Sequence, residues 1–159
     1  MTSDIASITL HYPNGAAPKA MDHERTQAIQ DLCREGQIKF SNAGGPYAID
    51  LSIENRQLVL KAVNDGGAAL PHLILSLSPY RGIIKDYFLM IESYEAMRKE
   101  GRTEKLEPID MARRGIHNEA ADLMIERLKD KVAMDHNTAR RLFTLVCVLH
   151  MDQARLWAG

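Results

Sequence analysis

Residues 47–67 read YAIDLSIENRQLVLKAVNDGG, and this stretch decides the fold because it predicts two paired strands. In residues 47–53 apolar side chains alternate with small or polar ones, which is typical of a strand with one buried face and one wet face. A tight turn at 54–56 leads into a second strand at 57–63, which is apolar on both faces. The NDGG sequence at 64–67 favours a hairpin, since its residues tolerate positive φ.

The segments on either side extend this sheet. Residues 73–77 carry alternating leucines, which predict a further strand that ends before Pro79. Residues 5–11 predict a first strand. Between this strand and the central pair, apolar residues recur at helical spacing, with Pro18 suited to the first turn of a helix and Gly36 to its end.

Beyond the last strand the apolar period changes from two to about 3.6, which predicts three helices. Gly101 ends the first of them, and the second spans about 109–131. Asp135 or Asn137 can cap the third. Its segment 142–149, LFTLVCVL, also suits a strand, but the upstream cap and the helix-forming residues that follow it favour a helix.

The resulting order, β-α-β-β-β-α-α-α, predicts the α+β class. We expect an antiparallel sheet of about four strands with the helices packed on one face. The 159 residues fit one domain, 1–159, with a strand-rich half at about 1–78 and a helical half at about 79–159.

The composition excludes several classes of protein. The net charge of −1 provides no general attraction to nucleic acid or to anionic membranes. The longest nearly apolar run, 142–149, is far shorter than the ~20 residues of a membrane helix, and the N-terminus does not resemble an export signal. Cys33 and Cys147 lie in apolar-periodic segments, which favours buried thiols over a disulfide. We therefore expect a cytoplasmic protein that does not associate with membranes.

Familiar catalytic motifs are absent from the sequence, including the phosphate-binding glycine loops, the G-x-S-x-G elbow, H-E-x-x-H and paired C-x-x-C. His117 and Glu119 form an H-x-E, but the zinc deaminase signature also needs P-C-x-x-C, and only Cys147 follows. Cys147 and His150 have the spacing of a thiol–imidazole pair, yet burial would keep the thiol protonated. The sequence thus predicts no cofactor and no metal ion, with His117 and Glu119 as the only catalytic candidates.

Two arginine pairs form the main candidate site. Arg113 with Arg114, and Arg140 with Arg141, can fork onto phosphate or carboxylate groups. The second pair is expected in the first turn of a helix, where cations oppose the macrodipole by ~0.3–1 kcal/mol, a cost that an anion would offset. The alternative is internal pairing: Asp110 lies three and four residues before the first pair, and other carboxylates can meet the second pair across helices.

His117 and Asn118 lie one helical turn after the first arginine pair. A histidine beside arginine tends to stay neutral at pH 7 and can act as a base or as a hydrogen-bond acceptor. Alternatively, both side chains bond backbone groups where helix and sheet meet. The predicted ligand-binding set is Arg113, Arg114, His117, Asn118, Arg140 and Arg141.

Three blocks of the sequence resemble a known family. PYRGIIKDYFLMIESYEAM (79–97), IDMARRGIHNEAADLMIERL (109–128) and DHNTARRLFTLVCVLH (135–150) are similar to the corresponding blocks of the UPF0262 family, small alphaproteobacterial proteins of unknown function. The resemblance covers nearly the whole chain, although Ala112 and Ala120 stand where the family pattern has glycine. It implies a bacterial, cytoplasmic, single-domain protein, and it implies no activity and no catalytic residue.

The sequence therefore leaves several functions open. The first is a non-enzymatic binding or protein-interaction module that binds a protein partner or a second copy of itself through the surface at 108–141. The alternative is a small enzyme or sensor that binds an anionic or phosphorylated metabolite through the arginines, with His117 or Glu119 for proton transfer. A nucleic-acid role comes third, disfavoured by charge.

Overall fold

The computed structural model describes residues 3–12, 21–41 and 43–157, with the side chains of all of these except 105 and 151–157. Pro18 lies outside the described residues. Short 3₁₀ segments precede α2 and α3. The strands and α-helices of the described part are β1 (Ile5–Leu10), α1 (Asp22–Glu35), β2 (Ile38–Phe40), β3 (Tyr47–Glu54), β4 (Gln57–Val63), β5 (Leu73–Ser76), α2 (Arg81–Lys99), α3 (Leu106–Leu128), β6 (Val132–Met134) and α4 (His136–Trp157).

The α+β class is confirmed, with a four-stranded sheet in the order β1-β3-β4-β5. β3 pairs with β4, and β4 with β5, in antiparallel fashion as predicted. β1 is parallel to β3, so the sheet is mixed. The physical reason is that the chain passes through α1 between these two strands, and a helical crossover returns the chain in the same direction. β2 and β6 form a second sheet of two strands. The sequence did not predict it, because three-residue strands are too short to show an apolar period.

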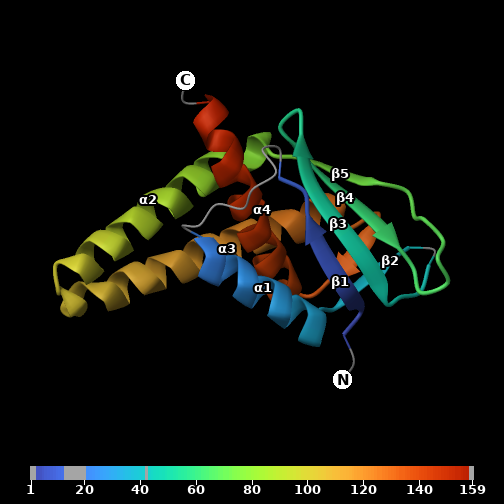
Figure 1. The fold of residues 1–159 in the computed structure, drawn as a ribbon, viewed down its shortest axis with the longest axis horizontal. Coiled ribbons are helices and arrows are strands. Elements are labelled where there is room, and N and C mark those ends of the chain that lie inside the picture. The colour runs from blue at the N-terminus through green and yellow to red at the C-terminus, as the bar shows by residue number, and fades with distance from the viewer. Residues whose placement is uncertain (1–2, 13–20, 42, 158–159) are drawn as a thin grey trace.

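The tight turn between β3 and β4 has the backbone that the sequence predicts. Asn55 and Arg56 have φ values of 53° and 61°, as a two-residue type I′ turn requires. The odd-numbered residues of β3 are buried and the even-numbered ones are not. Figure 1 shows the helices grouped on one side of the sheet, which is the side that the buried face of β3 packs against.

Helix α4 lies at the centre of the molecule, so the segment 142–149 is helical. Asp135 caps it, since its side chain accepts a hydrogen bond from the backbone N–H of Thr138 at 2.9 Å. Leu145, Val146 and Cys147 are at most 1% exposed. This part of the helix is apolar nearly all round because α1, α3 and β3 all contact α4. A helix that is buried on every side has the same composition as a buried strand, which explains the ambiguity of the sequence.

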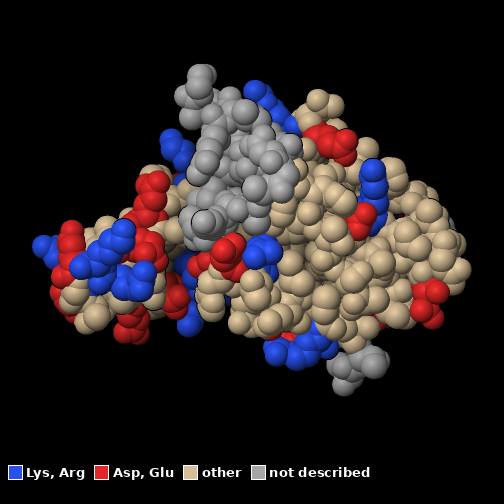
Figure 2. All heavy atoms as spheres, in the orientation of Figure 1, with Lys and Arg blue, Asp and Glu red and all other residues tan. Residues whose placement is uncertain are grey.

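Helices α2 and α3 run side by side and form an arm that projects away from the sheet (Figure 1). Gly101 ends the α2 side of the arm with a φ of 73°, a value that glycine adopts without strain. Acidic and basic side chains are interspersed over the far end of the arm, whereas the surface over the sheet carries fewer of them in the same view (Figure 2). Nearer the body, Ala120 and Ala121 of α3 are fully buried, and these small side chains let α3 approach α4 closely.

The end of α1 is tied to the start of α4. A Cβ added at Gly36 would lie 2.5 Å from the Leu32 carbonyl oxygen and 2.7 Å from the Ile5 side chain, so only glycine fits there. Directly after it, the backbone N–H of Gln37 donates to the hydroxyl of Thr138 at 2.8 Å. The last turn of α1 is thereby held beside the first turns of α4.

The state of the two cysteines and the absence of a membrane-spanning helix were both predicted from the sequence. Cys33 is half-buried and Cys147 is buried, and both are free thiols. Within the described residues, no helix has the length and apolar character needed to cross a membrane.

Candidate functional site

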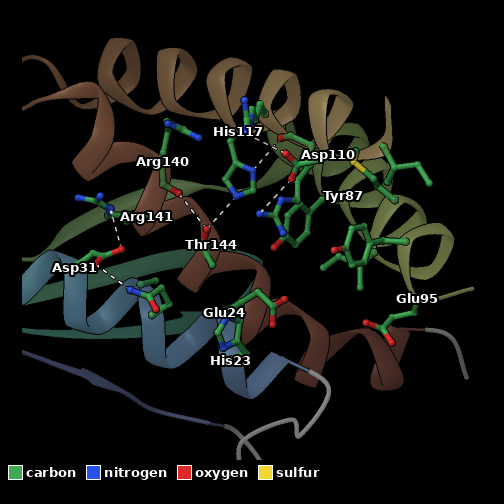
Figure 3. Close-up of a pocket in the computed structure, with 18 of the residues that line it drawn as sticks. His23, Glu24, Asp31, Tyr87, Glu95, Asp110, His117, Arg140, Arg141 and Thr144 are labelled. Atoms are coloured by element: carbon green, nitrogen blue, oxygen red, sulfur yellow. Dashed lines mark hydrogen bonds and ion pairs between the residues drawn. The ribbon is translucent and has the colours of Figure 1, made fainter. Parts of the chain in front are cut away.

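Four helices surround one open cleft with a volume of about 770 Å³ (Figure 3). This volume falls within the roughly 300–1,000 Å³ of typical small-molecule sites. The charged residues that line the cleft are five arginines and four carboxylates: Arg98, Arg113, Arg114, Arg140, Arg141, Glu24, Asp31, Glu95 and Asp110. The fold therefore brings the two predicted arginine pairs, one from α3 and one from α4, to the same cleft.

Two of the cleft arginines share a single carboxylate. Arg114 contacts Asp110 at 3.1 Å, and Arg113 contacts the same carboxylate at 3.7 Å. These are the i+3 and i+4 pairings that the sequence predicts. Both arginines are largely exposed, so each pair contributes ~0–1 kcal/mol. The longer contact leaves the Arg113 guanidinium less tightly held than that of Arg114.

Arg141 has two partners on α1. Its guanidinium lies 2.6 Å from Glu35 and 3.7 Å from Asp31. The attachment of α1 to the start of α4 explains these contacts, because it places the last turn of α1 opposite Arg141. The sequence did not indicate them, since the partners are more than one hundred residues away along the chain.

Arg140 differs from the other three predicted arginines. It is half-buried, and it forms no ion pair with any carboxylate among the described residues. Its Nε atom is buried and has no hydrogen-bond partner in the part of the chain that the structure describes. Among the four predicted arginines, Arg140 is therefore the one with an unsatisfied buried donor, and such a donor costs about 1–3 kcal/mol.

The prediction that Arg140 and Arg141 lie in the first turn of their helix is wrong. α4 begins at His136 and is capped by Asp135, so Arg140 and Arg141 lie in its second turn. The effect of the macrodipole falls off within the first turn. Burial of Arg140, and not the helix dipole, is therefore what disfavours an uncompensated charge there.

His117 lies at the inner wall of the cleft and is 9% exposed. Its Nδ1 is 3.0 Å from the carbonyl oxygen of Arg113, and because a carbonyl only accepts, Nδ1 carries the hydrogen. Its Nε2 lies 3.0 Å from the hydroxyl of Thr144. Burial lowers the pKa of His117, and the charges of Arg113 and Arg140 lower it further against the opposing effect of the backbone hydrogen bond. His117 therefore favours the neutral form, as the sequence predicts.

Thr144 and Tyr87 also line the cleft, although the sequence did not indicate them as site residues. Thr144 follows Arg140 by four residues, and this spacing places both on one face of α4. Its hydroxyl lies between His117 Nε2 and, at 3.3 Å, the carbonyl oxygen of Arg140. Tyr87 is 1% exposed and packs edge-on against the ring of His117. Burial raises the pKa of Tyr87, and the charge of Glu24 contributes to the same direction.

Asn118 and Glu119 do not line the cleft, and both are exposed. Successive residues of a helix point about 100° apart, so only His117 of this run faces inward. The structure therefore separates Asn118 and Glu119 from the arginines.

Cys147 and His150 of α4 lie outside the cleft. Cys147 is 0% exposed, and burial raises its pKa well above the usual range, which keeps the thiol protonated. The ring of His150 stacks on Phe88. Within the part of the chain that the structure describes, no three His, Cys, Asp or Glu side chains gather as a metal site.

Comparison with known sequences shows the family to which the chain belongs. The uncharacterised protein family UPF0262 matches residues 2–152. The chain belongs to this family. A UPF0262 protein of Chelativorans sp. is 45% identical over 148 residues, which cover 92% of each chain. A second, of Rhizobium meliloti, is 42% identical over 92% of this chain and 93% of the relative. A third, of Brucella canis, is 40% identical over 94% of this chain and 98% of the relative.

No solved structure matches the chain. UPF0262 is defined by sequence and carries no described activity. Inferences about function therefore depend on the geometry of the cleft.

Proposed function

We propose that this UPF0262 protein is a non-enzymatic binding protein that holds a small anionic molecule, with a carboxylate or a phosphate group, in the cleft between α1, α2, α3 and α4. Arg140 carries this proposal. Arg140 is half-buried and lines the cleft, and its buried Nε has no hydrogen-bond partner among the described residues. An anionic group in the cleft would pair with this guanidinium and compensate its charge.

The other charges of the cleft also favour an anion. Arg113 and Arg114 share Asp110, so this trio carries an excess of positive charge. The guanidinium of Arg113 is held by a contact of only 3.7 Å and can turn towards a ligand. Arginine forks match the geometry of carboxylate and phosphate groups.

The state of His117 argues for binding over catalysis. Both of its ring nitrogens are within 3.0 Å of protein atoms, one a carbonyl and the other the hydroxyl of Thr144. A general base needs a free nitrogen within reach of the proton that it takes. Glu119, the other catalytic candidate, does not line the cleft.

A thermal-shift screen tests the proposal with inorganic phosphate, glutarate and 3-phosphoglycerate as probes. A ligand that binds the folded state raises stability by RT ln(1 + [L]/Kd), about 2.7 kcal/mol at one hundred times the Kd. We expect at least one probe to raise Tm in the wild type. The rise should disappear in Arg140→Gln and persist in Arg127→Gln, a matched change at an exposed arginine of α3 outside the cleft.

Without a probe, Arg140→Gln should be at least as stable as the wild type, because it removes an uncompensated charge. Binding sites often trade stability for function in this way. An Arg140→Gln variant that unfolds would show that the arginine is structural. An unchanged response to every probe in that variant would equally contradict the proposal.

Self-association is the second candidate function. Leu89 of α2 and Met111 of α3 are 52% and 63% exposed, and α2 and α3 form the projecting arm (Figure 1). A dimer in which these side chains pack against the second copy would remove their apolar surface from water. Sedimentation velocity over a range of concentrations should then show a dimer that Leu89→Lys and Met111→Lys weaken. A monomer at all concentrations would exclude this candidate.

The proposal includes a cytoplasmic location. The support is that Cys33 and Cys147 are both free, as thiols are in reducing compartments. Cell fractionation with an antibody to the protein would test it.

A further inference from the structure

Glu24 is the acidic counterpart of Arg140. It lies on α1, is half-buried and lines the same cleft. The other three carboxylates of the cleft have arginine partners. Glu95 pairs with Arg98, Asp110 pairs with the two arginines of α3, and Asp31 pairs with Arg34 and Arg141. Glu24 alone among the four cleft carboxylates has no ion pair or hydrogen bond within the described residues.

The fold holds the two uncompensated charges apart. Arg140 belongs to α4 and Glu24 to α1, and no ion pair joins them. Figure 3 shows them at different sides of the cleft, with Thr144 labelled between them. A direct contact would have compensated both charges, so their separation leaves room for a molecule that carries a charge of each sign.

The neighbouring groups are suited to such a molecule. Glu24 and Tyr87 line the same cleft, and the negative charge of Glu24 acts on Tyr87, so the Glu24 side of the cleft also carries an aromatic residue. At the other side, the charges of Arg113 of α3 and Arg140 of α4 both act on His117. The cleft therefore presents an acidic and aromatic side and a basic side.

We propose that the ligand of the cleft is dipolar, a small amino-acid-like molecule whose ammonium group binds Glu24 and whose carboxylate or phosphate group binds Arg140. This inference rests on the proposed anion-binding function and narrows it. Anions without an ammonium group would use only half of the site.

Isothermal titration calorimetry with two matched probe pairs tests the inference. Glutamate differs from glutarate by its ammonium group, and O-phosphoserine differs from 3-phosphoglycerate by an ammonium in place of a hydroxyl. We expect the ammonium-bearing member of at least one pair to bind the wild type roughly tenfold more tightly, the value of one hydrogen bond between charged groups. Glu24→Gln should remove this preference, whereas Glu92→Gln, at an exposed glutamate of α2 outside the cleft, should keep it.

The outcomes separate the two proposals. If both members of each pair bind equally and Arg140→Gln weakens both, the cleft binds anions and the dipolar ligand is excluded. A preference that persists in Glu24→Gln also excludes it, because another group then reads the ammonium. If no probe binds the wild type, or if Arg140→Gln binds the probes as the wild type does, the anion site fails and the dipolar ligand fails with it. Unliganded Glu24→Gln should keep the wild-type Tm, which separates loss of binding from loss of the fold.

Discussion

His117 and Thr144 share one hydrogen bond whose direction depends on protonation. In neutral His117, Nδ1 donates to the carbonyl of Arg113, so Nε2 accepts from the hydroxyl of Thr144. In protonated His117, Nε2 would donate, and the hydroxyl hydrogen would turn to the carbonyl of Arg140, 3.3 Å away. Burial and two arginines oppose the second state, so the neutral arrangement stabilises the contact between α3 and α4.

The lowered pKa of His117 predicts a pH dependence of stability. As the pH falls, the unfolded chain takes up a proton near pH 6.5 before folded His117 does, so stability is full above about pH 6.5 and is lost below it towards the folded pKa. Urea unfolding at pH 7.5 and 5.5 measures the loss. It should be smaller in His117→Gln than in the wild type and in the control His72→Gln, which changes an exposed histidine. An equal loss in all three would contradict the assignment.

The hydroxyl of Thr144 should contribute measurably to stability. Thr144→Val keeps the shape of the side chain but leaves the buried Nε2 of His117 without a partner, at a cost of ~1–3 kcal/mol. Thr144→Ser retains the hydroxyl and should stay close to the wild type. Urea unfolding compares the free energies of the two variants. If Thr144→Val were as stable as Thr144→Ser, the hydrogen bond would have no net value.

At the scale of elements, local patterns predicted what depends on neighbours in sequence. The β3–β4 hairpin follows from alternation and from two residues that tolerate positive φ, and the pairing of Asp110 follows from helical spacing. The parallel pairing of β1 and the contact of Arg141 with Glu35 depend on how distant segments pack. No local period encodes such contacts. The sequence therefore predicted that the arginines lie together, but not that Arg140 is the one without an ion pair among the described residues.

The close approach of α3 and α4 predicts a steric effect. Ala120 is fully buried and lies one helical turn after His117, which contacts Thr144 of α4, so Ala120→Leu should cost ~1–3 kcal/mol through overpacking. Ala112→Leu makes the same change on an exposed face of α3, where roughly ±0.5 kcal/mol is expected. Thermal unfolding followed by circular dichroism measures both variants. Equal effects would show that α3 is not tightly packed at Ala120.

At the scale of the whole molecule, stability should differ between the body and the α2–α3 arm. Most residues at 93–100 are exposed, whereas those at 142–149 are almost all buried. Elements with few buried contacts open at lower free energy. The cleft lies between these two regions, where the arm meets α1 and α4 (Figure 3), so a ligand there would also link the arm to the body.

Hydrogen exchange followed by mass spectrometry tests this difference. Amides at 93–100 should exchange much faster than those at 142–149, and a bound probe should slow exchange at the α2 residues that line the cleft. Equal protection of the arm and of α4 in the unliganded protein would contradict the expected difference.

The central claim is that Arg140 is the anion-binding group of the cleft. A titration with the probe that raises Tm most, followed through the ¹H–¹⁵N signals of arginine Nε groups, tests it most directly. The Arg140 signal, assigned by its loss in Arg140→Gln, should shift progressively to saturation while that of exposed Arg127 stays in place. An Arg140 signal that does not move, or that moves no more than the Arg127 signal, would contradict the claim.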